Sequence, residues 1–225
     1  MRKMNEYSFI LWHDSLMPAT AKTVKRTASR ERRRQQLIDA TIKCIARKGM
    51  GSTTLGDVAG EAGLSQGIVN LHFESKDNLL NETLKFIADD YKTEFNSALS
   101  KSGPGAAAKL HAVMELDLRP SILDRRKLAV WFAFWGEVKS RPTYRKICEK
   151  SDEYYDEVVR KLCDELITDG VYPNVSAAAI TTTLTSMTNG MWLSCLISPK
   201  LFDRQSALNA IDEYLHSIFP KHFPL

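Results

Sequence analysis

The sequence predicts an all-α fold in two parts, a small N-terminal bundle of short helices and a larger C-terminal helical bundle. Three observations favour this fold class. Apolar residues recur three and four positions apart along nearly the whole chain, whereas the strict alternation of a half-buried strand is hard to find. Gly, Pro, Ser and Thr residues stand where such helices would begin or end. The composition, with 44% hydrophobic and 26% charged residues, is ordinary for a globular protein.

The chain begins with a basic extension that is predicted to be flexible over residues 1–28. Residues 1–16 fit either an unstructured tail or a choice of start site, because Met17 would serve equally well as the first residue. Residues 22–48 hold ten Lys or Arg against two acidic residues, whereas the whole chain has a formal net charge of only +4. Such a local excess of cations favours a polyanionic partner, although a charge run is often only a solvated helix face.

The first helix is predicted over residues 32–48, and two short helices follow it. Thr54 is a candidate N-cap with Asp57 at the reciprocating position of a capping box. Gly63 is placed to end this second helix in a left-handed conformation, and Ser65 caps the next one, "QGIVNLHF". Two short amphipathic helices joined by a glycine turn are typical of a helix-turn-helix, although a plain αα-corner gives the same pattern. A helix-turn-helix DNA-binding domain of three helices is therefore predicted over residues 29–75.

The second helix of this motif is predicted to read DNA bases through its outward side. The residues on that side are Gln66, Gly67, Asn70 and Leu71. Gln and Asn side chains pair well with adenine edges, and a glycine lets the helix approach the bases closely. Phosphate contacts are expected from residues at three helix starts, which are Thr54, Ser65 and Lys76. His72 stays ambiguous, because helical periodicity turns it toward the anchoring side of the helix.

The rest of the chain, residues 76–225, is predicted to form the second domain. A long helix is expected from Ser75 to about Leu99, and a glycine-rich break follows at residues 103–105. Five further helices are expected, with Pro or Gly at most of their ends, over residues 106–118, 122–139, 142–169, 176–198 and 204–218.

The segment "AVWFAFWGEV" concentrates aromatic residues beside one carboxylate. Trp131 and Trp135 share one side of the expected helix because they are four positions apart. Aromatic faces with a carboxylate suit a quaternary ammonium cation, since each ring contributes up to ~2 kcal/mol once desolvated. A plain helix core and a lipid-facing stripe are the alternatives. The candidate ligand-binding residues are Trp131, Phe134, Trp135, Glu137, Tyr144, Asn189 and Trp192, with Asp117 or Glu115 as other possible counter-charges.

Two segments resemble a known family. Residues 35–80 resemble the DNA-binding domain of the TetR family of bacterial repressors, with Gly49, Thr54, Gly63, Phe73 and Lys76 among the matching positions. Residues 128–198 resemble the choline-responsive members of that family, which control glycine betaine synthesis, through "WFAFWGEVKSRPTYRKI" and "TNGMWLSCLI".

The resemblance implies a homodimer joined through the last two long helices and bound to double-stranded palindromic operator DNA. It implies that a small-molecule effector, choline or a related quaternary ammonium compound, binds residues 76–225 and releases the repressor. It also implies a phosphate contact for His72. Asn70 and Leu71 stand where many members have tyrosines.

Other function classes find little in the sequence. Metal-ligand spacing, nucleophile motifs and dinucleotide-binding glycine patterns are lacking, so neither an enzyme nor a cofactor is expected. Four scattered cysteines, and no apolar run near the roughly 20 residues of a membrane span, indicate a reduced, cytoplasmic chain without membrane contact. Two alternatives remain to a choline-responsive repressor: a repressor of this type with a different hydrophobic or cationic ligand, and a non-catalytic onium-binding protein.

Overall fold

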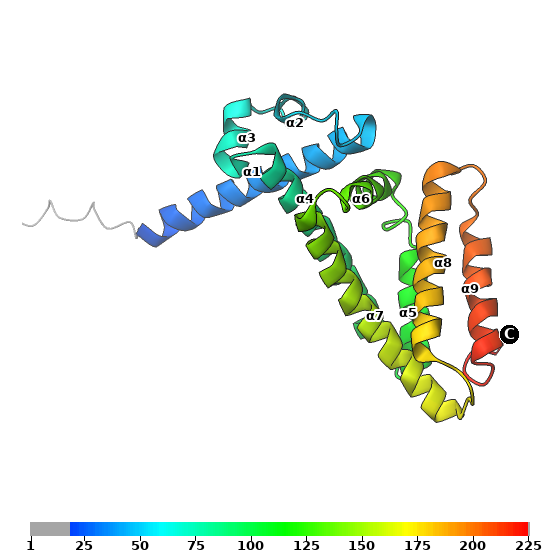
Figure 1. The fold of residues 1–225 in the computed structure, drawn as a ribbon. Helices are drawn as coiled ribbons and strands as arrows, with labels where there is room; N and C mark the ends of the chain where they lie inside the picture. The colour runs from blue at the N-terminus through cyan, green and yellow to red at the C-terminus, as the bar shows by residue number, and fades with distance from the viewer. Residues whose placement is uncertain (1–18, 225) are drawn as a thin grey trace, which may run out of the picture.

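The computed structural model describes residues 19–224, with side chains described from residue 29 onward. This part of the chain folds into nine helices and contains no strand (Figure 1). In chain order the helices are α1 (Ala19–Lys48), α2 (Leu55–Glu61), α3 (Gln66–Phe73), α4 (Lys76–Lys101), α5 (Ala106–Asp117), α6 (Arg125–Glu137), α7 (Pro142–Gly170), α8 (Ala177–Ile197) and α9 (Arg204–Ile218). The predicted all-α fold class is confirmed.

The predicted helix ends agree with the structure except at α1. The ends of α4 to α9 lie within three residues of the predicted ones. Helix α1, by contrast, begins at Ala19 instead of residue 32, so residues 19–28 of the extension predicted to be flexible are helical. The sequence from Ala19 to Lys48 contains no Gly or Pro, so no helix-breaking residue prevents α1 from beginning at Ala19. The predicted tail, residues 1–16, lies outside the described residues.

Helices α1, α2 and α3 pack around one small core, and we call this unit the head. Leu37 and Cys44 of α1, Val58 of α2, and Val69 and Phe73 of α3 are buried together in this core. Val69 and Phe73 have no exposed surface, so α3 is anchored along one side and leaves its other side to solvent. This is the arrangement predicted for a helix-turn-helix.

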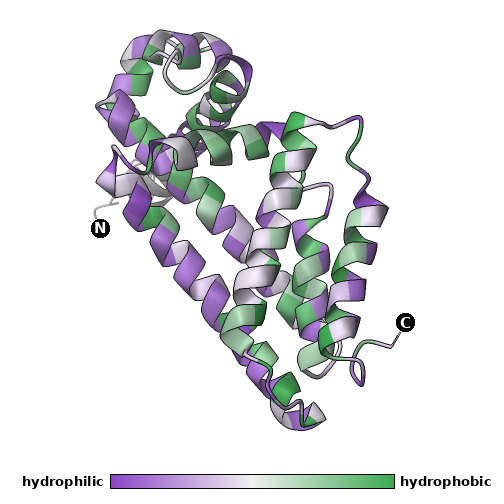
Figure 2. Ribbon diagram, turned by 45° about the vertical axis from the view of Figure 1, so that its right-hand side comes forward, coloured by the Kyte–Doolittle hydropathy of each residue, from purple (hydrophilic) through white to green (hydrophobic). Residues whose placement is uncertain are grey.

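Helices α5, α7, α8 and α9 and the second half of α4 form the larger bundle, which we call the body. Its core includes Phe95 of α4, Leu110 of α5, Leu162 of α7, Leu184 of α8 and Leu215 of α9. Hydrophilic and hydrophobic residues alternate along these helices in Figure 2, as expected for helices that bury one side. Figure 1 shows α4 running from the head into the body, and α8 and α9 side by side at one edge.

A third cluster, which we call the junction, joins the head to the body. It contains Ile45 of α1, Leu84 of α4, Phe134 of α6 and Tyr144 of α7, all of them buried. Helix α6 lies between the head and the bundle in Figure 1, and it packs against α1, α7 and α8. A displacement of α6 therefore acts directly on the first helix of the head.

Candidate functional site

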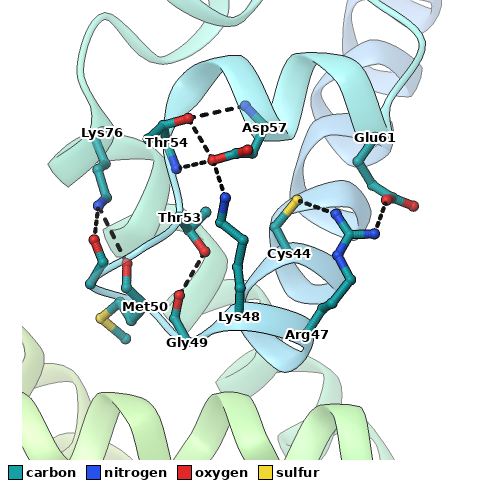
Figure 3. A network of polar contacts seen from close by, with 11 residues as sticks. Cys44, Arg47, Lys48, Gly49, Met50, Thr53, Thr54, Asp57, Glu61 and Lys76 are labelled. Carbon is teal, nitrogen blue, oxygen red and sulfur yellow. Dashed lines mark hydrogen bonds and ion pairs between the residues drawn. The ribbon is translucent and has the colours of Figure 1, made fainter.

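The start of α2 is fixed by a reciprocal capping arrangement (Figure 3). The Thr54 hydroxyl accepts a hydrogen bond from the backbone N–H of Asp57 at 3.2 Å, and the Asp57 carboxylate accepts one from the backbone N–H of Thr54 at 2.8 Å. The predicted capping box is thus confirmed. At the other end of α2, Gly63 has a φ of +64°, which allows the sharp turn into α3.

Two ion pairs hold α2 against the end of α1. The Lys48 ammonium lies 2.6 Å from the Asp57 carboxylate, and the Arg47 guanidinium lies 3.0 Å from the Glu61 carboxylate (Figure 3). The hydrogen bond from Lys48 holds the pKa of Asp57 well below its usual range. Asp57 is therefore charged at neutral pH, and its charge is neutralised by Lys48.

Helix α3 presents the predicted base-reading residues on one accessible side. Gln66, Gly67, Asn70 and Leu71 are all exposed, while Val69 and Phe73 point into the head. Leu71 is 71% exposed, which leaves its methyl groups free to contact a thymine methyl group. The amide groups of Gln66 and Asn70 lie on the same side of the helix one turn apart, as two neighbouring base pairs would require.

The residues expected to contact phosphates differ in how free they are. Ser65 is the N-cap of α3, and its side chain makes no capping hydrogen bond. The Thr54 hydroxyl is exposed but engaged with Asp57. The Lys76 ammonium donates to two backbone carbonyl oxygens of the turn after α1, at 3.3 Å each, and so ties α4 to that turn (Figure 3). Lys76 therefore has a structural role whether or not it also meets DNA.

His72, the residue that periodicity left ambiguous, lies half-buried in the last turn of α3. Burial, followed by the positive charges of Arg30 and Arg34 on α1, lowers the pKa of the imidazole. His72 is therefore mostly neutral at pH 7, and any phosphate contact it makes is that of a neutral hydrogen-bond donor.

The body holds a partly enclosed cavity of about 200 Å³ between α4, α5, α6, α7 and α8. Five of the predicted ligand-binding residues line it, namely Asp117, Trp131, Trp135, Asn189 and Trp192. The volume suits a small ligand, because an engineered cavity of about 150 Å³ in another protein binds benzene. Residues from five helices thus line one cavity, which the sequence alone predicted only in part.

Aromatic rings form much of the cavity wall. Tyr91 of α4 stands edge-on to Trp192 of α8 and to Tyr155 of α7, with ring centres 5.8 Å and 4.9 Å apart. Trp131 and Trp135 follow each other along α6, with ring centres 6.1 Å apart. A cation in the cavity is therefore surrounded by ring quadrupoles from four helices.

Asp117, at the end of α5, is the most buried carboxylate of the cavity. Burial raises its pKa to about 7, against the opposing effect of hydrogen bonds from Tyr91 and Thr188. The Trp192 indole N–H also donates to the backbone carbonyl oxygen of Asp117 at 2.7 Å. The carboxyl group is thus held in one place by α4 and α8 while its negative charge lacks a cationic neighbour.

Two further carboxylates, Asp152 and Asp156, stand one turn apart on α7 and also line the cavity, but both remain exposed to solvent, unlike Asp117. Burial, followed by the charges of Asp156 and Glu149, raises the pKa of Asp152 to about 6. Among residues 29–224, no Lys, Arg or His lies within ion-pair distance of Asp117, Asp152 or Asp156. Grouped carboxylates without a partner favour a cationic ligand.

Four predicted ligand-binding residues lie outside the cavity, which corrects the prediction for Phe134, Glu137, Tyr144 and Glu115, the last of which is half-buried on α5. Phe134 and Tyr144 belong to the junction and pack against each other, with ring centres 4.9 Å apart. Phe134 leaves α6 about 60–100° away from Trp131 and Trp135, so it meets α1 and α4 instead. Glu137 lies exposed at the end of α6, where its carboxylate is 4.0 Å from Arg141. Its charge is neutralised at the surface.

Among the cavity residues that the prediction missed are four with polar or ionisable side chains, Tyr91, Asp152, Tyr155 and Asp156. A signal for three of them stands in the segment "SDEYYDEVV". Asp152, Tyr155, Asp156 and Val159 are spaced i, i+3, i+4 and i+7, so one side of a helix carries two carboxylates and a phenol where an apolar stripe is expected. Polar residues in the position of a core stripe indicate a binding cavity.

Other parts of the described chain offer no comparable site. An open hollow of about 670 Å³ lies between α5, α9 and the C-terminal segment, but its walls contain one aromatic residue of the Phe, Tyr and Trp type, Phe223. Within residues 19–224, no group of three or more His, Cys, Asp or Glu residues is placed to hold a metal ion. None of the helices described is both long and apolar enough to cross a membrane.

Comparison with known proteins gives a family match for each part of the fold. The family described as "Bacterial regulatory proteins, tetR family" matches residues 37–83, and the one described as "BetI-type transcriptional repressor, C-terminal" matches residues 106–220. The HTH-type transcriptional regulator BetI of Paraburkholderia phymatum is 31% identical to the chain over 193 residues, which cover 84% of this chain and 94% of that protein.

Solved structures share the fold. A transcriptional regulator from Pseudomonas aeruginosa PAO1 has a TM-score of 0.76 at 24% identity, covering 86% of this chain and 94% of its own. A transcriptional regulator from Saccharomonospora viridis, solved in complex with choline, has a TM-score of 0.73 at 21% identity, covering 83% of this chain and 96% of its own. The two family matches coincide with the head and the body, and they describe regulators rather than enzymes. The chain belongs to the TetR family of bacterial transcriptional regulators, in its BetI-type branch.

Proposed function

We propose that the protein is a dimeric repressor that binds a palindromic operator in the cytoplasm and is released when choline, or a closely related quaternary ammonium cation, enters the cavity of the body. The observation that carries this proposal is the composition of that cavity. Three carboxylates without a cationic partner share about 200 Å³ with six aromatic side chains from α4, α6, α7 and α8. A methylated ammonium group has no N–H to donate, so ring faces and negative charge are the interactions that recognise it.

The structural relative from Saccharomonospora viridis supports the choice of ligand, because it was solved with choline. Choline carries one positive charge and a hydroxyl group. The positive charge would lie near Asp117 and the Trp131–Trp135 pair. The hydroxyl group would find hydrogen-bond partners in Asn189 or Thr188, which line the same cavity. Glycine betaine has the same ammonium group but a carboxylate of its own, which the aspartates would repel.

On the DNA side, each head would place α3 in the major groove. Gln66 and Asn70 would pair with base edges, Leu71 would contact a thymine methyl group, and Gly67 would allow close approach. Ser65, Thr54, His72 and Lys76 would hold the flanking phosphates, with Ser65 the freest of these side chains.

The proposed dimer face is the edge formed by α8 and α9. Leu193, Ile197 and Leu201 are exposed there, the last two by 68% and 85%, around an open hollow that also includes Met191 and Phe202. Apolar side chains gathered at one edge favour burial against a second copy. A two-fold axis through this edge would place the two α3 helices about 34 Å apart, one turn of DNA.

Helix α6 would carry the signal. Trp131 and Trp135 line the cavity, while Val130 and Phe134 of the same helix are buried in the junction with Ile45 of α1. A ligand that displaces the tryptophans would therefore move the residues on which the head rests. Since operator binding needs both heads at a fixed spacing, a small rotation of each would weaken it.

The test is operator binding with and without ligand. A duplex selected by the protein from a random library serves as the operator, and its affinity is measured with choline, glycine betaine or neither. We expect millimolar choline to weaken operator binding by at least ten-fold and to raise the melting temperature, while glycine betaine changes neither. The proposal fails if choline alters neither quantity, and the repressor function itself fails if no duplex sequence is selected.

A further inference from the structure

The first half of α1 is a strongly basic helix that extends past the head. Residues 19–34 hold seven Lys or Arg and one acidic residue, Glu31. The core of the head begins only at Leu37, so some 18 residues of α1 precede it, about 25 Å of helix at 1.5 Å per residue. Figure 1 shows this part of α1 running out beyond α2 and α3.

Three of the seven basic residues, Arg26, Arg30 and Arg33, occupy positions on the side of α1 that faces the head. Leu37 and Cys44 pack in the core of the head against α2 and α3. Arg30 and Arg26 stand seven and eleven positions before Leu37, which puts them within about 20° of it around the helix axis. Arg33 lies within about 40° of the same line. One side of α1 therefore supports α3 in the second half of the helix and carries arginine positions in the first half.

The arginines described in this stretch fall into two groups. Arg34 is used inside the protein, since its guanidinium pairs with Glu82 of α4 and lies 4.8 Å from the centre of the Phe73 ring. Arg30, Arg32 and Arg33 are exposed, and none of them has an acidic partner within ion-pair distance among residues 29–224. Arg30 and Arg33 are near enough to His72, in the last turn of α3, to act on its charge, and Arg33 donates a hydrogen bond to Gln36. Guanidinium groups without an acidic partner thus stand beside the C-terminal end of the reading helix.

We propose that the basic first half of α1, residues 22–33, is a second DNA contact, which binds phosphates beyond the base pairs that α3 reads. The inference rests on the proposed operator binding. A basic helix that continues about 25 Å from the head spans roughly seven nucleotides of one strand at 3.4 Å each. These contacts add affinity and salt dependence but no sequence preference, because they are made to the backbone.

The test compares two duplexes and two triple variants. One duplex carries only the operator core selected from a random library by the unmodified chain, and the other carries ten arbitrary base pairs on each side. The variant of interest combines Arg26→Ala, Arg30→Ala and Arg33→Ala. The control combines Arg145→Ala, Lys146→Ala and Lys150→Ala on the exposed side of α7, which removes the same charge from the body.

We expect the α1 variant to bind the extended duplex at least ten-fold more weakly at 150 mM salt, and to lower the slope of log affinity against log salt by about 5, because the dimer loses six cations. It should bind the core duplex nearly as well as the unmodified chain, and its response to choline should be unchanged. The control should bind both duplexes normally. An equal loss on both duplexes, or no loss on either, would overturn this inference. If the unmodified chain selects no core sequence, the proposed function fails instead.

Discussion

The head and the cavity of the body treat their carboxylates in opposite ways. In the head, Asp57 and Glu61 lie against Lys48 and Arg47 at 2.6 Å and 3.0 Å, and the pKa of Asp57 is held low by its partner. In the cavity, Asp117 and Asp152 lack a cationic neighbour among the described residues, and burial raises their pKa values to about 7 and about 6. The carboxylates of α2 are paired without a ligand, whereas those of the cavity are not.

This difference follows the work that each region does. In the head, the carboxylates of α2 are paired with α1 and help to hold α3 in one orientation, and the residues proposed to read DNA are left exposed. The cavity has to respond to a solute, so it keeps negative charges whose neutralisation depends on what enters. Under the proposed function, binding of a cation would release a free energy that the unliganded protein has stored, and α6 stands where that release would act on the head.

The largest expected effect comes from removing the reading side chains. In a dimer, Gln66→Ala with Asn70→Ala deletes four base contacts, each worth about 1–3 kcal/mol of discrimination. We expect affinity for the selected operator to fall by about 1,000-fold or more, to the level of random DNA, with the melting temperature unchanged. Electrophoretic mobility shift against both duplexes measures this. A retained preference for the operator would contradict the assignment of α3.

The second effect removes the buried negative charge while preserving shape. Asp117→Asn should weaken choline binding by about 30-fold or more, since losing one member of a buried charge pair costs about 2–5 kcal/mol. Isothermal titration calorimetry measures the loss.

The same Asp117→Asn variant should change the stability of the unliganded protein with pH. The folded-state pKa of about 7 is raised above the value near 3.9 of an unfolded chain, so the native carboxyl group binds its proton more tightly. This contribution stabilises the fold at low pH and is lost as pH rises from about 4 through 7. Asn should therefore leave stability little changed at pH 4 and raise it at pH 8 by up to ~4 kcal/mol, as urea unfolding would show. Equal effects at both pH values would mean that Asp117 is not strained by its burial.

The third effect separates ring faces from apolar volume. Trp135→Phe keeps a quadrupole and Trp135→Leu does not, so choline affinity should fall about 3-fold in the first variant and about 10–30-fold in the second. The same pair of substitutions at Trp131 serves as a repeat on the neighbouring turn of α6. Equal losses for Phe and Leu at both positions would show that the rings act only as apolar wall.

The smallest effects are expected at the predicted residues that lie outside the cavity. Glu137→Gln should change choline affinity less than two-fold, because its carboxylate is exposed beside Arg141. Tyr144→Phe should also leave choline affinity unchanged while stabilising the protein by about 1 kcal/mol. The Tyr144 hydroxyl is buried without a hydrogen-bond partner among the described residues, and Phe removes that unsatisfied group. A ten-fold loss of choline binding in either variant would move the binding site toward the junction.

Local chemistry explains how much of the fold could be predicted from the sequence. The capping box at Thr54, the turn at Gly63 and the ends of α4 to α9 depend on residues close together in the chain, and each was predictable. The exposed side of α3 followed from helical spacing alone. The start of α1 at Ala19 was missed because a basic, alanine-containing stretch fits a flexible arm as well as a helix.

The cavity was predictable only in part, because its walls come from five helices that are far apart in sequence. Helix α6 is apolar on more than one side, so its sequence does not reveal that Trp131 meets the cavity while Phe134 meets the junction. Glu137 was predicted because it lies beside aromatic residues in the sequence. Asp117, Asp152 and Asp156, by contrast, come together only because α5 packs against α7. Whether a carboxylate has a cationic partner depends on the residues that surround it in space. The spacing of residues along one helix does not show these neighbours.

The pH dependence of choline binding in the unmodified protein is the most direct test of whether the carboxylates of the cavity hold the cation. A cation prefers ionised carboxylates, so its binding should lower the pKa values of Asp117 and Asp152 and release protons where these groups are partly protonated. Titration calorimetry at pH 5.5, pH 6.5 and pH 8, in two buffers of different ionisation enthalpy at each pH, measures the affinity and the proton release. We expect choline to bind about ten-fold more tightly at pH 8, with net proton release at pH 6–7. An affinity that does not change with pH, without proton release, would contradict the claim that these carboxylates hold the cation.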